Sequence, residues 1–144
     1  MRTETAPTVR LADYAPPDFL ADAVELSFRL APKATRVWAR VSFRRNPAGR
    51  PSADLRLDGR ALRLVSAAID GAAVPQNALS VDPEGLTVAA AHVPDAFAWE
   101  AETEIDPEAN TALEGLYMSR GMYCTQCEAQ GFRKITFWPD RPDV

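Results

Sequence analysis

The feature that most constrains the fold of this chain is an alternation of apolar and polar residues with a period of two. In residues 23–30 every second position is apolar, namely Val24, Leu26, Phe28 and Leu30. Successive side chains of a strand point to opposite faces, so this alternation is typical of a strand with one buried face and one face in water. The same pattern occurs in residues 36–45, 97–105 and 132–138, and shorter candidate strands cover residues 55–57, 62–69 and 86–90.

Turn-forming residues separate these segments. Pro, Gly, Asn and Asp gather in residues 45–53, 82–85 and 106–110, and these residue types favour turns. No segment keeps a period of 3.6 residues, although residues 111–119 are compatible with a single helical turn. The sequence therefore predicts an all-β domain that is mostly antiparallel, with little helix, built as a β-sandwich or a curved, saddle-like sheet.

The chain has the size of one domain. A chain of 144 residues buries about 70% of its unfolded surface when it folds. Its content of 47% hydrophobic and 25% charged residues is typical of globular proteins. We therefore expect a single domain over residues 1–144. Residues 1–17 are expected to form an extended arm, because Pro16 and Pro17 favour an extended entry into the first strand.

The charge pattern excludes some classes of partner. The net charge is −4, with both signs interspersed, which argues against a general nucleic-acid binder or membrane-surface binder. No segment approaches the roughly 20 apolar residues of a membrane span, and the first residues lack the apolar run of a secretory signal. We expect a cytoplasmic protein, in which both cysteines are reduced.

Both cysteines belong to one C-x-x-C motif, formed by Cys124 and Cys127. A thioredoxin-like redox pair needs a βαβ unit, which this sequence does not predict. A structural zinc site needs four Cys or His ligands, and the chain adds only the distant His92. We therefore interpret the cysteines as packed, reduced thiols and His92 as a surface histidine. The motifs of nucleotide-binding loops and zinc peptidases are absent from the chain.

Most acidic residues are expected on solvated strand faces and turns. This set comprises Glu25, Asp58, Asp70, Asp82 and Glu84. Glu128 differs because Gln126 lies two positions before it. On an extended segment both side chains project to the same face, so the pair can present a carboxylate and an amide to one ligand.

Two long segments resemble a known family. Residues 110–144, "NTALEGLYMSRGMYCTQCEAQGFRKITFWPDRPDV", resemble the end of the N-terminal β-domain of bacterial aminopeptidase N, a zinc-dependent metallo-aminopeptidase of the gluzincin type. Residues 9–47 resemble the start of that domain, including the Y-x-P-P-x-F entry at residues 14–19 and the A-T-R-V strand at residues 34–37. The resemblance covers nearly the whole chain.

The resemblance implies roles for two side chains. In similar enzymes the glutamate at the position of Glu128 reaches into the active site of the next domain and binds the α-amino group of the peptide substrate. The glutamine at the position of Gln126 lines the pocket for the first substrate side chain. The implied partners are peptides with a free N-terminus and the protein's own catalytic domain. The peptide bond between Glu128 and Ala129 is also expected to be cis, as in similar proteins.

The chain also departs from the family. The G-x-M-E-N strand, whose glutamate helps to bind the substrate amine in similar enzymes, is not in this sequence. The H-E-x-x-H helix with its downstream glutamate is also absent, and with it the family's zinc ligands and general base. We therefore expect a fragment that holds no zinc, has no catalytic residue of its own and is inactive alone. We also expect an exposed sheet edge that favours self-association.

An alternative function stays open at this point. The chain can be a stand-alone β-sandwich interaction module without peptidase activity. Its contact surface would then be an exposed sheet edge or the aromatic end formed by Tyr123, Phe132, Phe137 and Trp138.

Overall fold

The computed structural model describes residues 10–128 and 130–144, and within them the chain folds into ten strands and four short 3-10 turns. The strands are β1 (Phe19–Arg29), β2 (Thr35–Arg45), β3 (Leu55–Asp58), β4 (Arg63–Ile69), β5 (Ala72–Ala73), β6 (Leu79–Asp82), β7 (Gly85–Val88), β8 (Ala96–Ile105), β9 (Gly115–Ser119) and β10 (Met122–Gln126). The 3-10 turns are η1 (Leu11–Asp13), η2 (Gln76–Ala78), η3 (Ala90–His92) and η4 (Phe132–Lys134). The described residues contain no α-helix.

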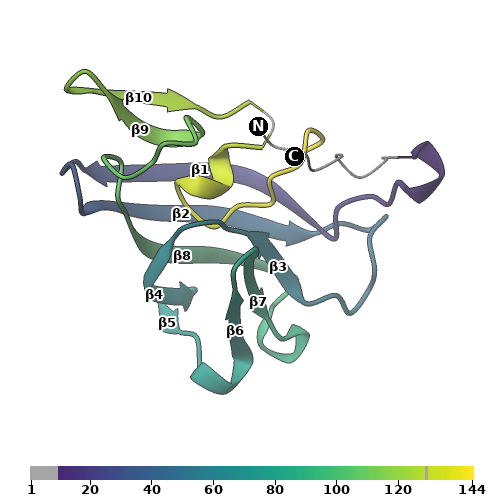
Figure 1. The fold of residues 1–144 in the computed structure, drawn as a ribbon. Helices are drawn as coiled ribbons and strands as arrows, with labels where there is room; N and C mark the ends of the chain where they lie inside the picture. The colour runs from purple at the N-terminus through teal and green to yellow at the C-terminus, as the bar shows by residue number, and fades with distance from the viewer. Residues whose placement is uncertain (1–9, 129) are drawn as a thin grey trace.

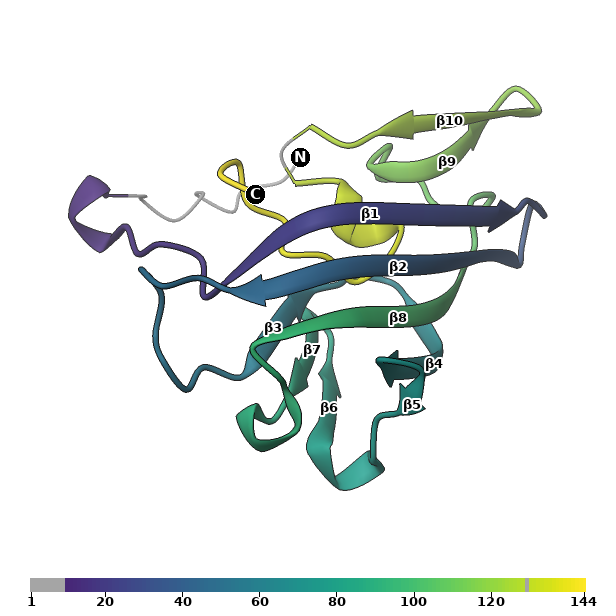
Figure 2. The same ribbon diagram turned by 180° about the vertical axis from the view of Figure 1, so that it is seen from behind.

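The strands form three antiparallel sheets. A five-stranded sheet has the order β1-β2-β8-β4-β5, a three-stranded sheet has the order β3-β7-β6, and β9 and β10 make a separate hairpin. In Figures 1 and 2 the long strands β1, β2 and β8 cross the molecule, the small sheet lies against one side of them, and the hairpin stands beside β1. The predicted all-β, mostly antiparallel fold with a sandwich-like arrangement is confirmed.

Strand β2 shows how the alternation produces this architecture. Its inward positions, Val37, Ala39, Val41 and Phe43, are at most 2% exposed. On the opposite face, Arg36 donates hydrogen bonds to Glu102 and Glu104 of β8, at 2.7 and 2.8 Å. Strand β2 therefore has one buried face and one solvent-exposed face that carries ion pairs, as an alternation with a period of two requires.

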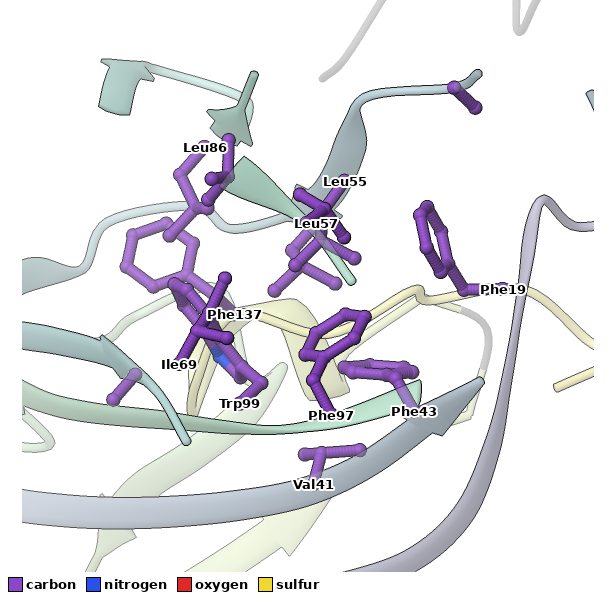
Figure 3. Close-up of a cluster of buried hydrophobic side chains, with 14 residues drawn as sticks. Phe19, Val41, Phe43, Leu55, Leu57, Ile69, Leu86, Phe97, Trp99 and Phe137 are labelled. Carbon is purple, nitrogen blue, oxygen red and sulfur yellow. The ribbon is translucent and has the colours of Figure 1, made fainter. Parts of the chain in front are cut away.

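The main core lies between the inner faces of the five-stranded and three-stranded sheets. Figure 3 shows Leu55, Leu57 and Leu86 facing Phe97 and Trp99. Trp99, Leu57 and Leu86 are completely buried. Aromatic packing adds to this cluster, because the Phe19 and Phe97 rings meet edge to face with their centroids 5.9 Å apart.

A second, smaller core joins the hairpin to the same sheet. It contains Val37 of β2, Ile105 of β8, Leu116 of β9 and Ile135 of the C-terminal segment. The hydroxyl of Thr103 donates to the carbonyl of Ile135 at 3.2 Å, which links β8 to that segment inside the core. The hairpin is thus attached to the domain through apolar packing at one end of β2 and β8.

Two local predictions were wrong. The segment 132–138 is not a strand, because hydrogen bonds from the Lys134 and Ile135 amides to the carbonyls three residues earlier close η4. Its apolar side chains serve two different cores, Ile135 in the smaller and Phe137 in the main one. Residues 111–119 form no helical turn, because positive φ angles of 59° at Leu113 and 71° at Gly115 end any helical path.

The apolar face of β1 is only partly covered. Val24 and Phe28 sit opposite Val41 and Val37 of β2 and share their inward face, yet they are 43% and 40% exposed. Strand β1 is the edge of its sheet, so no described strand pairs with its outer side. Leu30, which the alternation assigned to this strand, lies just beyond its end.

The N-terminal arm is described from Arg10 onward, and residues 1–9 lie outside the described part of the chain. Leu11–Asp13 form a 3-10 turn. Beyond it, the Tyr14 hydroxyl donates to Asp143 at 3.0 Å and Arg141 donates to the carbonyl of Ala15 at 2.7 Å. Residues 14 and 15 therefore lie against the C-terminal segment. No helix in the described ranges has the length and apolarity needed to cross a membrane.

The main core gives a direct stability prediction. Leu57→Ala removes a completely buried side chain and should lower the free energy of unfolding by about 2–5 kcal/mol. Val81→Ala, at a site that is 51% exposed, should change it by no more than about 0.5 kcal/mol. Urea unfolding followed by circular dichroism measures both values, and equal effects of the two changes would contradict this assignment of the core.

Candidate functional site

The candidate site lies at the end of the β9–β10 hairpin. Arg120 and Gly121 make its two-residue turn, with φ angles of +50° and +81°, which is the geometry of the hairpin turns that match strand twist. The register pairs Met122 with Ser119 at the turn and Gln126 with Gly115 at the open end. The alternation did not predict these two strands, and Arg-Gly is not one of the usual two-residue turn sequences, although its glycine suits a positive φ.

Hydrogen bonds fix the hairpin where it leaves the domain. The Asn110 side-chain amide donates to the carbonyls of Glu114 and Leu116 at 2.7 and 2.9 Å. The Met118 amide donates to the carbonyl of Pro107 at 3.1 Å. The open end of the hairpin, where Gln126 lies, is therefore held against the segment that follows β8.

The two faces of the hairpin have different roles. Residues directly opposite each other share a face, so Leu116 and Thr125 lie together on the face that packs into the smaller core. Cys124 and Gln126 lie on the other face, together with Met122, which is 62% exposed. The hairpin therefore presents Gln126 away from the domain core.

A compact loop follows β10 and carries Glu128. The Gly131 amide donates to the carbonyl of Cys127 at 3.2 Å and closes the loop. Gly131 is buried there, and a Cβ atom at this position would lie 2.3 Å from the carbonyl oxygen of Gln126 and 3.1 Å from the amide of Gly115. The loop thus folds tightly onto the open end of the hairpin, and only glycine fits at position 131.

The structure brings Gln126 and Glu128 together through a local hydrogen bond. The Gln126 side-chain oxygen accepts the backbone N–H of Glu128 at 3.0 Å. Strand β10 ends at Gln126 and Glu128 lies in the following turn, so the pair is not related by strand alternation as expected. Glu128 is exposed, and its carboxylate has no ion pair within residues 10–128 and 130–144. The Glu128–Ala129 peptide bond lies outside the described residues.

The two cysteines flank this site as free thiols. Cys124 is half-buried, but Cys127 is exposed on the loop, so the expectation of two packed thiols holds only for Cys124. Although Cys127 is exposed as a residue, partial burial of its sulfur, followed by the negative charge of Asp140, raises the pKa of its thiol. A catalytic redox cysteine needs the opposite shift, because the thiolate is its reactive form.

The other candidate groups do not converge on a site. His92 is exposed in the 3-10 turn η3. The described part of the chain contains no group of three or more His, Cys, Asp or Glu side chains that could hold a metal ion. The aromatic end is mostly packed: Phe137 is 2% exposed, and the half-buried Phe132 and Trp138 rings meet edge to face with centroids 5.5 Å apart. Tyr123 and Phe132 pack against the smaller core and Trp138 against the main one, so these rings contribute to the two cores.

Comparison with known proteins identifies homologues for the whole chain. No protein-family model matches it. It is 53% identical, over all 144 residues, to aminopeptidase N of Caulobacter vibrioides, and 42% identical, over 92% of its length, to aminopeptidase N of Escherichia coli. It spans 16% of the first relative and 14% of the second.

Solved structures show the same fold. Legionella pneumophila aminopeptidase A, crystallised with aspartic acid, matches 94% of this chain with a TM-score of 0.83 and 28% identity, over 16% of its own length. A mutant M1 zinc metallopeptidase from Deinococcus radiodurans, bound to a Tyr-Ser-Ala substrate, matches 87% of the chain with a TM-score of 0.69 and 14% identity, over 30% of its own length. The resemblance to aminopeptidase N is thereby confirmed for a segment the size of one domain.

The tight loop predicts the effect of a side chain at position 131. Gly131→Ala should lower the free energy of unfolding by about 1–3 kcal/mol, because its methyl group cannot fit beside the Gln126 carbonyl. It should also shift the amide NMR signals of Gln126 and Glu128. Gly71→Ala is a control for the loop signals, because no atom lies within 4 Å of its Cβ position. Its φ of +78° makes that alanine strained, so it should also lower the free energy of unfolding, but it should leave the Gln126 and Glu128 signals in place. Unchanged loop signals in Gly131→Ala would contradict the packing described here.

The raised pKa of Cys127 is testable by alkylation. In a Cys124→Ser variant, the rate of iodoacetamide alkylation should rise with pH. The pH at which this rate is half its maximum should be higher for the folded chain than for the same chain unfolded in urea. At neutral pH the folded thiol should therefore react more slowly than the unfolded one, because less of it is thiolate. A midpoint below that of the unfolded chain would favour the redox interpretation.

Proposed function

We propose that this chain, which is homologous to a domain-sized segment of aminopeptidase N, is the substrate-anchoring β-domain of a zinc-dependent aminopeptidase. Glu128 binds the free α-amino group of the peptide substrate, and Gln126 lines the pocket for the first substrate side chain. The domain acts together with a catalytic domain of the same polypeptide, in the cytoplasm.

One observation carries this proposal: an exposed carboxylate sits on a tightly built loop at the end of a hairpin whose outer face is turned away from the core. Glu128 has no ion-pair partner in the described ranges, whereas fourteen salt bridges engage other charged side chains of the domain. Its backbone is nonetheless fixed by the hydrogen bond to Gln126. A carboxylate held in place but left unneutralised is suited to bind an external cation.

The chemistry of an ammonium group fits this carboxylate. A charge-assisted hydrogen bond from the substrate ammonium to the Glu128 carboxylate is strong and directional, and it fixes the peptide end relative to the reacting bond. An internal peptide segment has no ammonium to offer and would leave the carboxylate desolvated and unpaired. Glu128 therefore selects for peptides with a free N-terminus, which makes the enzyme an exopeptidase.

The metal belongs to the other part of the enzyme in this proposal. No cluster of metal-ligating side chains occurs in the described part of the chain, so the residues here do not fit a zinc site. When bound by the catalytic domain, zinc supplies a Lewis acid and an activated water. The 144-residue chain alone is then inactive, and its contribution is to bind and orient the substrate amine.

The outer face of the hairpin is the proposed contact with the catalytic domain. Met122 is highly exposed at the turn, and Cys124 and Gln126 lie on the same face. Apolar residues on this face, with Gln126 and Glu128 at its end, are suited to line one side of a substrate pocket.

Substitution of Glu128 in the full-length enzyme tests this function. Glu128→Gln keeps the shape of the side chain but removes its charge, so kcat/KM on an aminoacyl anilide should fall roughly 10- to 150-fold, which corresponds to a charged hydrogen bond of about 1.5–3 kcal/mol. Glu25→Gln is a matched control, because Glu25 is also exposed but lies on the outer face of β1.

The two variants must differ for the proposal to stand. The Glu25→Gln enzyme should keep its kcat/KM within about twofold, because surface substitutions away from a site have small effects. An unchanged kcat/KM in Glu128→Gln would remove Glu128 from the substrate site.

A further inference from the structure

Arg133 and Asp140 form the least exposed ion pair among the described residues, with side chains only 11% and 12% exposed. The Arg133 Nε donates to Asp140 Oδ2 at 3.0 Å, and its Nη2 donates to the Asp140 carbonyl oxygen at 3.2 Å. The backbone N–H of Arg133 donates to the same carboxylate at 3.1 Å. Both the side chain and the backbone of Arg133 are therefore tied to Asp140.

The network continues to strand β3 through Asp58. The Asp58 carboxylate accepts the Asp140 backbone N–H at 3.0 Å and lies 3.7 Å from Arg133 Nη2. Asp58 also exchanges two backbone hydrogen bonds with Trp138, at 2.8 and 3.0 Å. The expectation that Asp58 belongs to a solvated face was wrong, because its half-buried carboxylate joins β3 to the C-terminal segment.

This network holds the end of the Glu128 loop. Arg133 comes two residues after Gly131, whose carbonyl accepts the Lys134 amide at 3.1 Å. The Arg133 carbonyl accepts the Arg60 amide at 2.9 Å. Strand β10 fixes the start of the loop and the Arg133 network fixes its end, so the position of Glu128 depends on both.

Two observations place the network beside the loop. Gln130 of the loop lines one open cleft of about 470 Å³ together with Asp58, Arg133 and Asp140. The charge of Asp140 also contributes to the raised pKa of Cys127, the residue immediately before Glu128. The network therefore lies next to the loop that carries Glu128.

We propose that Arg133, bound by Asp140 and Asp58, is a positioning residue that sets the place of the Glu128 carboxylate for the substrate amine. The inference rests on the proposed function of Glu128. An arginine suits this task because its planar guanidinium makes several hydrogen bonds in fixed directions, which a lysine ammonium does not reproduce. A nearly buried ion pair is weak evidence for a role in stability, because well-packed hydrophobic residues are often as stable in its place. We therefore assign this pair to placement of the loop.

A double-mutant cycle in the full-length enzyme tests the proposal. Arg133→Lys should lower kcat/KM on an aminoacyl anilide about 10- to 100-fold in the wild-type background, because small misplacements of a binding group are costly. In the Glu128→Gln background the same change should alter kcat/KM less than about twofold, since the misplaced group is already disabled. Any loss of thermal stability should be the same in both backgrounds.

Arg36→Lys is the matched control, because Arg36 also joins two carboxylates, Glu102 and Glu104, but on the outer face of the main sheet. It should leave kcat/KM within about twofold in both backgrounds. If Arg133→Lys does not fold, Asp140→Asn replaces it in the same cycle, because it removes one charge and keeps an oxygen acceptor.

The outcomes separate this inference from the proposed function. Equal losses of kcat/KM from Arg133→Lys in both backgrounds, with a normal effect of Glu128→Gln, would overturn the positioning role alone. Unchanged kcat/KM in Glu128→Gln itself would overturn the function of Glu128, and the positioning role with it. Loss of the Arg133 effect in the Glu128→Gln background supports both.

Discussion

The packing of the two inner sheet faces against each other is the constraint on which the rest of the structure depends. Trp99 of β8 and Leu57 of β3 are completely buried in this shared core. Because strand residues alternate between faces, each inward side chain also fixes the register of its neighbours. The outer faces are then free to carry charge pairs such as Arg36 with Glu102 and Glu104.

The candidate site depends on this core through two attachments. The smaller core places the hairpin over β2 and β8 through Leu116 and Ile135. The Asp58 carboxylate and its backbone pairing with Trp138 place the C-terminal segment on β3. The loop with Glu128 lies between these two attachments, so both sheets contribute to its position although neither contains it. A site built in this way combines an exposed binding group with a rigid support.

The sequence predicted the long strands well, because burial on one face leaves a clear period of two. It could not predict η4, because Ile135 and Phe137 alternate as in a strand but serve different cores. Alternating apolar residues indicate which side chains are buried, but they do not show which part of the structure covers them. The hairpin escaped prediction for a related reason: its strands have five residues each, and only Leu116 of its side chains is buried.

The site itself was only partly predictable. Glu128 and Gln126 were selected by their spacing and by the family resemblance, but the turn that relates them depends on Gly131, which packs against Gln126 and Cys127 and against Gly115 of strand β9. A glycine three positions after the glutamate was the available signal. The role of Asp58 had no local signal, because its partners Arg133 and Asp140 follow more than seventy residues later.

The most direct test of the central claim is a crystal structure of the full-length enzyme with an amino acid or short peptide bound at the active site. We expect the ligand's ammonium nitrogen to lie about 2.7–2.9 Å from a carboxylate oxygen of Glu128, the distance of a charge-assisted hydrogen bond. A ligand whose ammonium is bound entirely by other residues, with Glu128 turned to solvent, would contradict it.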